Sequence, residues 1–312
     1  MSKLGFDDFV GNEQAVQKTL LLIDEARGDS SIRMPDLAFL GPSGHGKTVL
    51  SSIVANECDR KLLIINSTVI REPFQFRGLI IDLVDSATSG AIVLLDECHA
   101  LSRKIQDNLL TATEHPRELH TSHKDQVFTD KLPQNLSFIF ATTHAGALKP
   151  ALLGRLETVE FLPYSTKEQL EMAIKYMERA YKIDRAKMPV ECMIDIAKRS
   201  RSGRQVVKFC DTLIRYMKKN KQDEITIDVV EKCFEILGVD KYGLTRVDHI
   251  MLKHLCQMNT FVGLDTLDAI MPTDKKQIRE HIEPFLLKQG FIIRTASGRM
   301  ITPQGRKASK GV

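Results

Sequence analysis

Long apolar stretches are missing from this sequence. No apolar run approaches the roughly 18 residues that a membrane-spanning helix needs, so we expect no membrane association. No apolar segment of signal-peptide type follows Met1 to Asp8. A C-x-x-C motif is also missing, although six cysteines fall in apolar stretches: Cys58, Cys98, Cys192, Cys210, Cys233 and Cys256. We therefore expect reduced core thiols in a cytoplasmic protein, not disulfides or a metal site.

A strong overall charge is missing too, because the 312 residues carry a formal net charge of only +4. The charge is unevenly placed. Residues 272–312 contain nine Lys or Arg against three Asp or Glu, which leaves the rest of the chain slightly negative. A basic C-terminal module favours nucleic acid as a partner, and a solvated basic tail is the alternative.

The sequence does contain a glycine-rich stretch, Gly41-Pro-Ser-Gly-His-Gly-Lys-Thr48. It fits the phosphate-binding pattern G-x-x-x-x-G-K-[ST], and it lies between an apolar strand and a helix. Gly44 and Gly46 let backbone N–H groups converge on phosphate oxygens at a helix N-terminus. Lys47 is predicted to reach the β- and γ-phosphates of ATP, and the Thr48 hydroxyl is predicted to ligate Mg²⁺.

A buried strand at 91–95 ends in Asp96-Glu97, which predicts the second half of the nucleotide site. Asp96 would hold Mg²⁺, and Glu97 would polarise the attacking water. Further strands at 37–40, 62–65 and 136–141 alternate with helices, which is typical of an α/β layer with a parallel sheet. Ligands of such sheets bind at the carboxyl ends of the strands.

Three other residues are weaker candidates for the same site. Thr143 follows the strand at 136–141 and could bond the γ-phosphate or the water. Arg155 could reach a neighbouring subunit's γ-phosphate as an arginine finger, and Arg204 could touch phosphates from a lid. An ordinary strand threonine and two surface arginines are the alternatives. The histidines lack metal-ligand spacing, so we expect solvated or capping roles for His99, His120, His123 and His144.

The pattern turns wholly helical after residue 162. We expect an ATPase domain at 1–162, a small helical lid domain at 163–238 and a winged-helix domain at 239–312. Ser165 and Glu168 form the capping box that opens the lid. Helices followed by a hairpin at 291–302 predict the winged helix. Residues 304–312 are expected to fray.

The order of these motifs resembles the AAA+ ATPases and, among them, the RuvB family of Holliday-junction branch-migration motors. The segments that carry the resemblance are 41–48, 95–101, 141–146, 199–204, 263–267, 282–291 and 294–299. It implies an ATP- and Mg²⁺-dependent hexameric ring acting on DNA. It also implies sensor roles for Thr143 and Arg204 and the finger role for Arg155. By the same resemblance, Phe9 and Val10 line the adenine pocket, and DNA is contacted by Lys275, Arg294 and Arg299.

The sequence departs from the RuvB pattern in several places. One finger arginine is lost at Leu153, and the usual N-terminal Leu-Arg-Pro is missing. Residues 117–131 fall where the family has a hairpin that grips RuvA. This stretch is polar here, and its expected tip is residues 120–124. We therefore expect a divergent relative whose hairpin takes a RuvA-like partner, a dedicated partner or DNA itself.

The sequence leaves three functions open. The leading one is a ring motor that moves branched DNA. The second is an ATP-switched loader or adaptor, such as one of a mobile element, that recruits another protein to DNA. The third is a structural relative that does not hydrolyse ATP, against which Lys47, Asp96, Glu97 and Arg155 argue.

Overall fold

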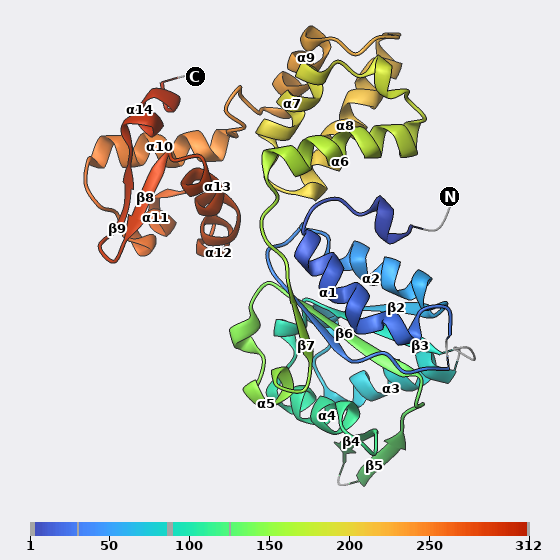
Figure 1. Ribbon diagram of the computed structural model, residues 1–312. Coiled ribbons are helices and arrows are strands. Elements are labelled where there is room, and N and C mark those ends of the chain that lie inside the picture. The colour runs from blue at the N-terminus through green and yellow to red at the C-terminus, as the bar shows by residue number, and fades with distance from the viewer. Residues whose placement is uncertain (1–3, 30, 86–89, 125, 311–312) are drawn as a thin grey trace. The chain divides into compact units, whose positions relative to one another are not determined.

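The computed structural model describes residues 4–29, 31–85, 90–124 and 126–310 (Figure 1). Contacts divide the chain into two compact units. The first contains Met1–Glu168 together with Ser202–Arg204, and the second contains Gln169–Arg201 and Gln205–Val312. The short segment Ser202–Arg204 thus packs with the first unit, although the chain on both sides of it packs with the second. The three-domain division expected from the sequence stays a prediction.

A five-stranded parallel sheet forms the centre of the first unit, as the alternating pattern predicts (Figure 1). In spatial order its strands are β2 (Lys61–Asn66), β3 (Ala91–Asp96), β6 (Leu136–Thr142), β1 (Leu37–Leu40) and β7 (Glu157–Glu160). Leu40 pairs with Thr142, and Asn66 pairs with Asp96. The carboxyl ends of the central strands therefore meet at one edge of the sheet, where the phosphate-binding loop begins.

Helices cover both faces of this sheet because its strands are apolar on both faces. Along β3, Ile92 and Leu94 pack with α1 (Glu13–Ile23) and α2 (Lys47–Glu57). Val93 and Leu95, which alternate with them, pack on the other face. That face is covered by α3 (Pro73–Asp85) and α4 (Arg103–Thr113). Within the described residues, no helix has the length and apolarity to cross a bilayer.

The sequence pattern does not predict the edge strand β7. Its four residues are Glu-Thr-Val-Glu, and Val159 is the buried residue among them. Such a strand is too short and too polar to stand out by periodicity. It forms because Leu37 to Leu40 offer their free side for parallel pairing after the short helix α5 (Pro150–Leu153).

The predicted hairpin at 117–131 is present as β4 (Glu118–His123) and β5 (Gln126–Lys131). Its turn lies after His123, one end of the range expected from the sequence, and residue 125 lies outside the described residues. At the base, buried Arg117 donates to Asp36 at 3.2 Å and to the Ala112 carbonyl at 2.8 Å. Arg117 therefore anchors the hairpin to the sheet and is no part of a partner-binding tip.

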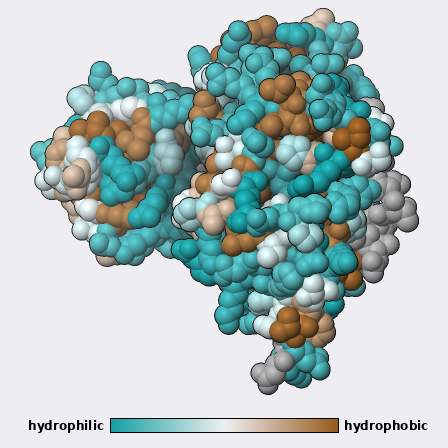
Figure 2. Space-filling model, turned by 60° about the horizontal axis from the view of Figure 1, so that its bottom comes forward, coloured by the Kyte–Doolittle hydropathy of each residue, from teal (hydrophilic) through white to brown (hydrophobic). Residues whose placement is uncertain are grey.

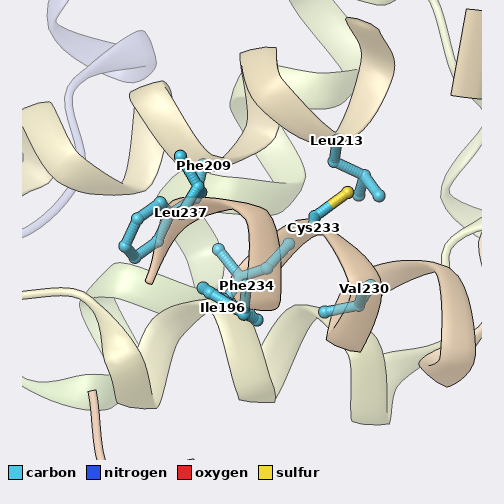
Figure 3. A pocket seen from close by; sticks show the side chains of 7 residues that line it. All are labelled: Ile196, Phe209, Leu213, Val230, Cys233, Phe234 and Leu237. Atoms are coloured by element: carbon cyan, nitrogen blue, oxygen red, sulfur yellow. The ribbon is translucent and has the colours of Figure 1, made fainter. Parts of the chain in front are cut away.

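A bundle of four helices opens the second unit: α6 (Thr166–Tyr181), α7 (Val190–Arg199), α8 (Gly203–Lys219) and α9 (Ile227–Leu237). The predicted capping box is present, since Ser165 Oγ donates to Glu168 at 2.7 Å and accepts from its N–H. A small pocket inside the bundle is lined by apolar groups of α7, α8 and α9, among them Cys233 (Figure 3). Burial raises the pKa of this thiol to about 11. The pocket is part of a hydrophobic core and offers no polar group to a ligand.

The winged helix follows with its own hydrophobic core. Its elements are α10 (Arg246–Met258), α11 (Leu264–Ile270), α12 (Lys275–Gln277), a π-helical turn (Ile278–Ile282), α13 (Glu283–Lys288), β8 (Ile292–Thr295) and β9 (Gly298–Ile301). The sequence predicts one continuous helix from Asp274. Pro284, which has no N–H to donate, breaks its regularity. The chain widens instead, and the Glu283 N–H donates to the carbonyl of Ile278.

The expectation that residues 304–312 fray is wrong for most of that stretch. A final helix, α14, spans Pro303–Ala308. Pro303 suits its first position, and the Thr302 hydroxyl accepts the Gly305 N–H at 3.0 Å. Ala308 is buried in the winged-helix core. Residues 311–312 lie outside the described residues.

Candidate nucleotide site and nucleic-acid interface

The phosphate-binding loop joins β1 to α2 at the carboxyl edge of the sheet. Lys47 is the first residue of α2, and its Nζ donates to the carbonyls of Gly41 at 2.7 Å and Pro42 at 2.9 Å. Lys47 is 7% exposed. Burial lowers the pKa of this ammonium, and the nearby carboxylates of Glu97 and Asp96 oppose that shift. The structure thus brings Lys47 and the two predicted acidic residues together.

Two glycines of the loop are in the left-handed region, and neighbouring side chains also crowd the position that a Cβ would take on each of them. A Cβ on Gly46, at φ +97°, would lie 2.6 Å from both Phe9 Cζ and the Tyr164 hydroxyl. A Cβ on Gly44, at φ +76°, would lie 3.0 Å from Ser202 Oγ and 3.4 Å from Arg204 Cβ. Phe9 and Arg204, two residues singled out from the sequence, therefore flank the loop.

Val10 follows Phe9 and is buried, whereas Phe9 is partly buried against the core cluster beneath α1 and α2. Tyr164 was not predicted to take part. Its hydroxyl donates to the His45 carbonyl at 3.0 Å, its ring stacks on the His45 ring, and burial raises its pKa. A tyrosine shortly before a helical segment gives no sequence signal for such a role.

Asp96 ends β3, and Glu97 follows it in the left-handed conformation at φ +50°. Asp96 Oδ1 accepts the Glu97 N–H at 3.0 Å, which fixes the turn between the two carboxylates. Glu97 Oε2 lies 3.3 Å from His99 Nδ1. A non-glycine residue at positive φ is uncommon, and such strain concentrates at functional sites.

A pair of histidines connects Glu97 to the end of β6. His99 Nδ1 lies 3.1 Å from the hydroxyl of Thr142, which is fully buried. Thr143 Oγ1 lies 2.8 Å from His144 Nδ1, and the rings of His99 and His144 are 4.9 Å apart. The solvated or capping role expected for His99 is therefore corrected. In the sequence, His99 lies three residues after Asp96. This closeness to the predicted acidic pair is the signal that could have indicated a role for His99 in the site, although the histidines lack metal-ligand spacing.

The predicted residue Thr143 lies just past β6, where it bonds His144. Buried Thr142, which sequence reasoning passed over, is the one that contacts His99 and accepts the His144 N–H at 3.0 Å. Arg155 lies after α5, exposed, and its guanidinium donates to Glu114 at 2.8 Å and to the Ala151 carbonyl at 3.2 Å. In a single chain, Arg155 thus forms an ion pair with Glu114 at the surface.

The residues at this edge fit a nucleoside triphosphate together with Mg²⁺. Lys47 Nζ is held by two loop carbonyls that phosphate oxygens can replace. The loop opens an 11-residue helix whose N–H groups attract anions. Thr48, second in that helix, and Asp96 supply the hydroxyl and carboxylate oxygens that Mg²⁺ prefers.

The two arginines that are predicted to contact DNA from the wing, Arg294 and Arg299, lie in different environments. Arg294 on β8 and Arg299 on β9 are register partners, and both donate to Glu283. The Arg294 side chain is 54% exposed, whereas Arg299 is buried and gives two nitrogens to Glu283 Oε2, at 2.8 and 3.1 Å. The expected direct contact therefore suits Arg294. Arg299 instead braces the wing against buried Glu283, a residue that no sequence motif singles out.

The third predicted DNA contact, Lys275, begins α12. Its ammonium pairs with Asp265, which raises the Lys275 pKa. Asp268 lies within 3.9 Å of the same nitrogen. Lys275 is about half exposed and its partners are exposed, so this pairing is weak and can be exchanged for a phosphate.

Comparison with known proteins gives two matching family models. Residues 241–310 match the RuvB C-terminal winged helix domain, and residues 37–164 match the ATPase family associated with various cellular activities (AAA). A Holliday junction branch migration complex subunit RuvB from Christiangramia forsetii is 30% identical, over 96% of this chain and 86% of its own. The RuvB of a Nitratiruptor species is also 30% identical, over 95% and 88%.

The chain belongs to the RuvB family. Its fold agrees with this assignment, since the RuvB Holliday junction branch migration motor of Thermotoga maritima superposes with a TM-score of 0.81. The match covers 98% of this chain and 97% of that structure at 26% identity. A point variant of the same RuvB gives a TM-score of 0.82. The RuvB winged-helix match includes the wing and Lys275, and the AAA match includes Lys47, Asp96, Glu97, Thr143 and Arg155.

Proposed function

We propose that this protein is an ATP-hydrolysing ring motor of RuvB type that moves branched DNA. The observation that carries the proposal is the convergence of Lys47, Asp96 and Glu97 at the strand ends of a RuvB-family chain. The nucleotide site supplies the ATPase, and the wing and α12 supply the DNA surface. Buried, unpaired thiols favour a reducing compartment such as the cytoplasm.

In this mechanism Lys47 leaves the carbonyls of Gly41 and Pro42 and binds the β- and γ-phosphates of ATP. Phe9 and Val10 line the side of the site that takes the adenine. Thr48 and Asp96 would hold Mg²⁺, which offsets phosphate charge when bound. Glu97 orients and polarises the attacking water, with His99 fixing its carboxylate. Thr143 and Arg204 contact the γ-phosphate region from the strand end and the lid segment.

We further propose a hexameric ring in which Arg155 acts on the ATP of the neighbouring subunit. Arg155 is exposed and pairs with exposed Glu114. A surface ion pair of this kind is worth less than about 1 kcal/mol, so Arg155 can exchange it for a phosphate. The hairpin β4–β5 takes a RuvA-like or dedicated partner, because it projects from the sheet (Figure 1).

The hairpin has more apolar surface than the sequence suggests. Val127 on β5 is 76% exposed, and Figure 2 shows brown surface on the projecting hairpin. Phe128 beside it lies under Arg77, 4.7 Å from ring centroid to guanidinium, and against Phe74. Arg77 also donates to Asp130 at 2.6 Å. A partner would therefore meet Val127 and part of Phe128 on a rigidly supported strand whose other residues are polar.

The deciding experiment measures ATP turnover and strand displacement with and without four-way junction DNA. We expect DNA to raise turnover and ATP to drive movement of the branch point. Lys47→Ala should lose nucleotide binding and both activities. A DNA-stimulated ATPase that never displaces strands would favour a loader, and absence of turnover in the unaltered protein would refute the motor.

A further inference from the structure

The segment Arg199-Ser-Arg-Ser-Gly-Arg204 uses its arginines in three different places. Arg199 pairs within the helical bundle, with Asp195 on its own helix and Glu231 on α9. Arg204 lies beside Gly44 of the phosphate-binding loop, in the first unit. Arg201, between them, contacts the winged helix. One short segment therefore connects the nucleotide loop, the bundle and the winged helix.

Arg201 contacts four separate parts of the winged helix. Its guanidinium pairs with Asp248 on α10 and donates to the carbonyls of Gly243 at 3.1 Å and His281 at 3.3 Å. It also lies over the Phe285 ring on α13, 4.1 Å from the centroid. A planar guanidinium makes these bonds and this stacking at once, whereas a lysine ammonium cannot. Arg201 therefore holds the start of α10, the π-helical turn and α13 in one arrangement.

The main partner of Arg201 has little freedom to move. Asp248 is fully buried, and its Oδ2 accepts the N–H and the hydroxyl of Thr245, both at 2.6 Å. This is the capping box that begins α10. Charge-assisted bonds to a buried carboxylate are strong and directional. A displacement of Arg201 is therefore passed to the N-terminus of α10.

We propose that Arg201 is a positioning residue that couples ATP turnover to DNA binding by the winged helix. Arg201 is joined by one peptide bond to Ser202, whose Oγ would lie 3.0 Å from a Cβ on Gly44 of the phosphate-binding loop. A change in the loop on ATP binding or hydrolysis moves Ser202, and Arg201 transmits that movement to α10 and α13. The inference rests on the proposed function, because it requires both an ATPase and DNA binding by the same chain.

Arg199 provides a matched control two residues away. It is as buried as a core residue, and it stacks on Phe234 at 4.3 Å much as Arg201 stacks on Phe285. Its ion-pair partners, Asp195 and Glu231, belong to the bundle and not to the winged helix. Loss of Arg199 therefore tests general damage to the bundle, and loss of Arg201 tests the connection.

The experiment uses the full chain with Arg201→Gln, Arg201→Lys and Arg199→Gln. Three quantities are measured for each: basal ATP turnover, the Kd for four-way junction DNA, and turnover at saturating DNA. For both Arg201 variants we expect basal turnover and Kd close to the unaltered protein. The stimulation by DNA should fall by about fivefold or more, the low end of typical coupling between sites. Arg199→Gln should keep its stimulation.

Arg201→Lys keeps a positive charge beside buried Asp248, so it can fold even where Arg201→Gln does not. Full DNA stimulation in a folded Arg201 variant would overturn the proposal. An equal loss in Arg199→Gln would overturn it too, because general bundle damage would then explain the effect. If the unaltered protein shows no stimulation by DNA, the proposed function fails first and the inference fails with it.

Discussion

Lys47 and Glu97 are each held by a partner inside the chain before any ligand arrives. Lys47 is bonded to its own loop, and Glu97 lies beside His99. The site is thus preformed in its backbone, and Lys47 has to change partners when ATP binds, whereas Glu97 keeps its contact with His99. Substitutions at these residues should separate nucleotide binding from hydrolysis.

Glu97→Gln should bind ATP nearly as well as the unaltered protein and hydrolyse it about 100 to 10,000 times more slowly. An amide has the same shape but cannot polarise the attacking water. Equilibrium binding of a fluorescent ATP analogue and steady-state turnover measure the two properties. Normal turnover in Glu97→Gln would remove the role that we give to this carboxylate.

His99→Ala should lower kcat about tenfold, equivalent to 1.4 kcal/mol in the barrier, with little change in KM. The imidazole contacts Glu97 and Thr142, and neither of these is among the residues that we assign to nucleotide binding. His99→Asn keeps a polar nitrogen near the position of Nδ1 and should retain more activity. His120→Ala, on the hairpin, is the control, and an equal effect there would contradict a specific role for His99.

Among the elements, the wing hairpin contains two neighbouring arginines for which we propose different functions. Arg294 and Arg299 face each other across β8 and β9, and both reach Glu283. Their exposure separates them, since Arg294 is half exposed and Arg299 is buried. DNA affinity should depend on the first and folding stability on the second.

Arg294→Ala should weaken DNA binding about equally for all sequences and reduce the salt slope of binding by roughly one unit. Its loss of folding stability should stay below about 1 kcal/mol, because Arg294 is half exposed and buried Glu283 keeps its two bonds from Arg299. Arg299→Ala leaves buried Glu283 with one partner and should cost about 2 kcal/mol of stability. Fluorescence titrations in several salt concentrations and urea unfolding measure both effects. Equal stability losses for the two variants would refute this division.

The strands at 37–40, 91–96 and 136–142 could be predicted because buried parallel strands are continuous apolar runs. The nucleotide residues could be predicted because the phosphate-binding loop has a fixed spacing. Local patterns do not reveal β7, which depends on its neighbour for pairing, or the π-helical turn before Pro284. They also miss the burial of Arg299 and the contact of His99 with Thr142, since both depend on side chains from distant segments.

For the whole molecule, the placement of Arg155 makes a prediction about assembly. Arg155→Ala and Lys47→Ala proteins should each be inactive, and a mixture of the two should recover part of the turnover. In a mixed ring some interfaces contain an intact Lys47 site facing an intact Arg155. Turnover is measured across mixing ratios, with co-assembly checked by size-exclusion chromatography. Mixtures that assemble but stay inactive would argue against action on the neighbour.

The hairpin makes a second prediction about assembly. A RuvA protein should bind weakly, and the binding should weaken further as salt rises, because most of the hairpin surface is polar. Val127→Asp should abolish what binding there is and leave ATP turnover unchanged, since Val127 is an exposed hairpin residue and is not among the residues that we assign to the nucleotide site. Biolayer interferometry at two salt concentrations tests this. Tight binding that is insensitive to salt would show that the apolar contact is larger than Val127 alone.

The return of Ser202–Arg204 to the first unit has a consequence for how such a gene can be rearranged. The chain passes between the units three times, after Glu168, after Arg201 and after Arg204. A single recombination breakpoint at residue 168 would join the first 168 residues to the remainder of another protein. The segment that packs against Gly44 of the nucleotide loop would then come from that other protein. Exchange of the ATPase alone is therefore disfavoured. The ATPase and the bundle should be inherited together, and the winged helix can follow only if its contact with Arg201 is kept.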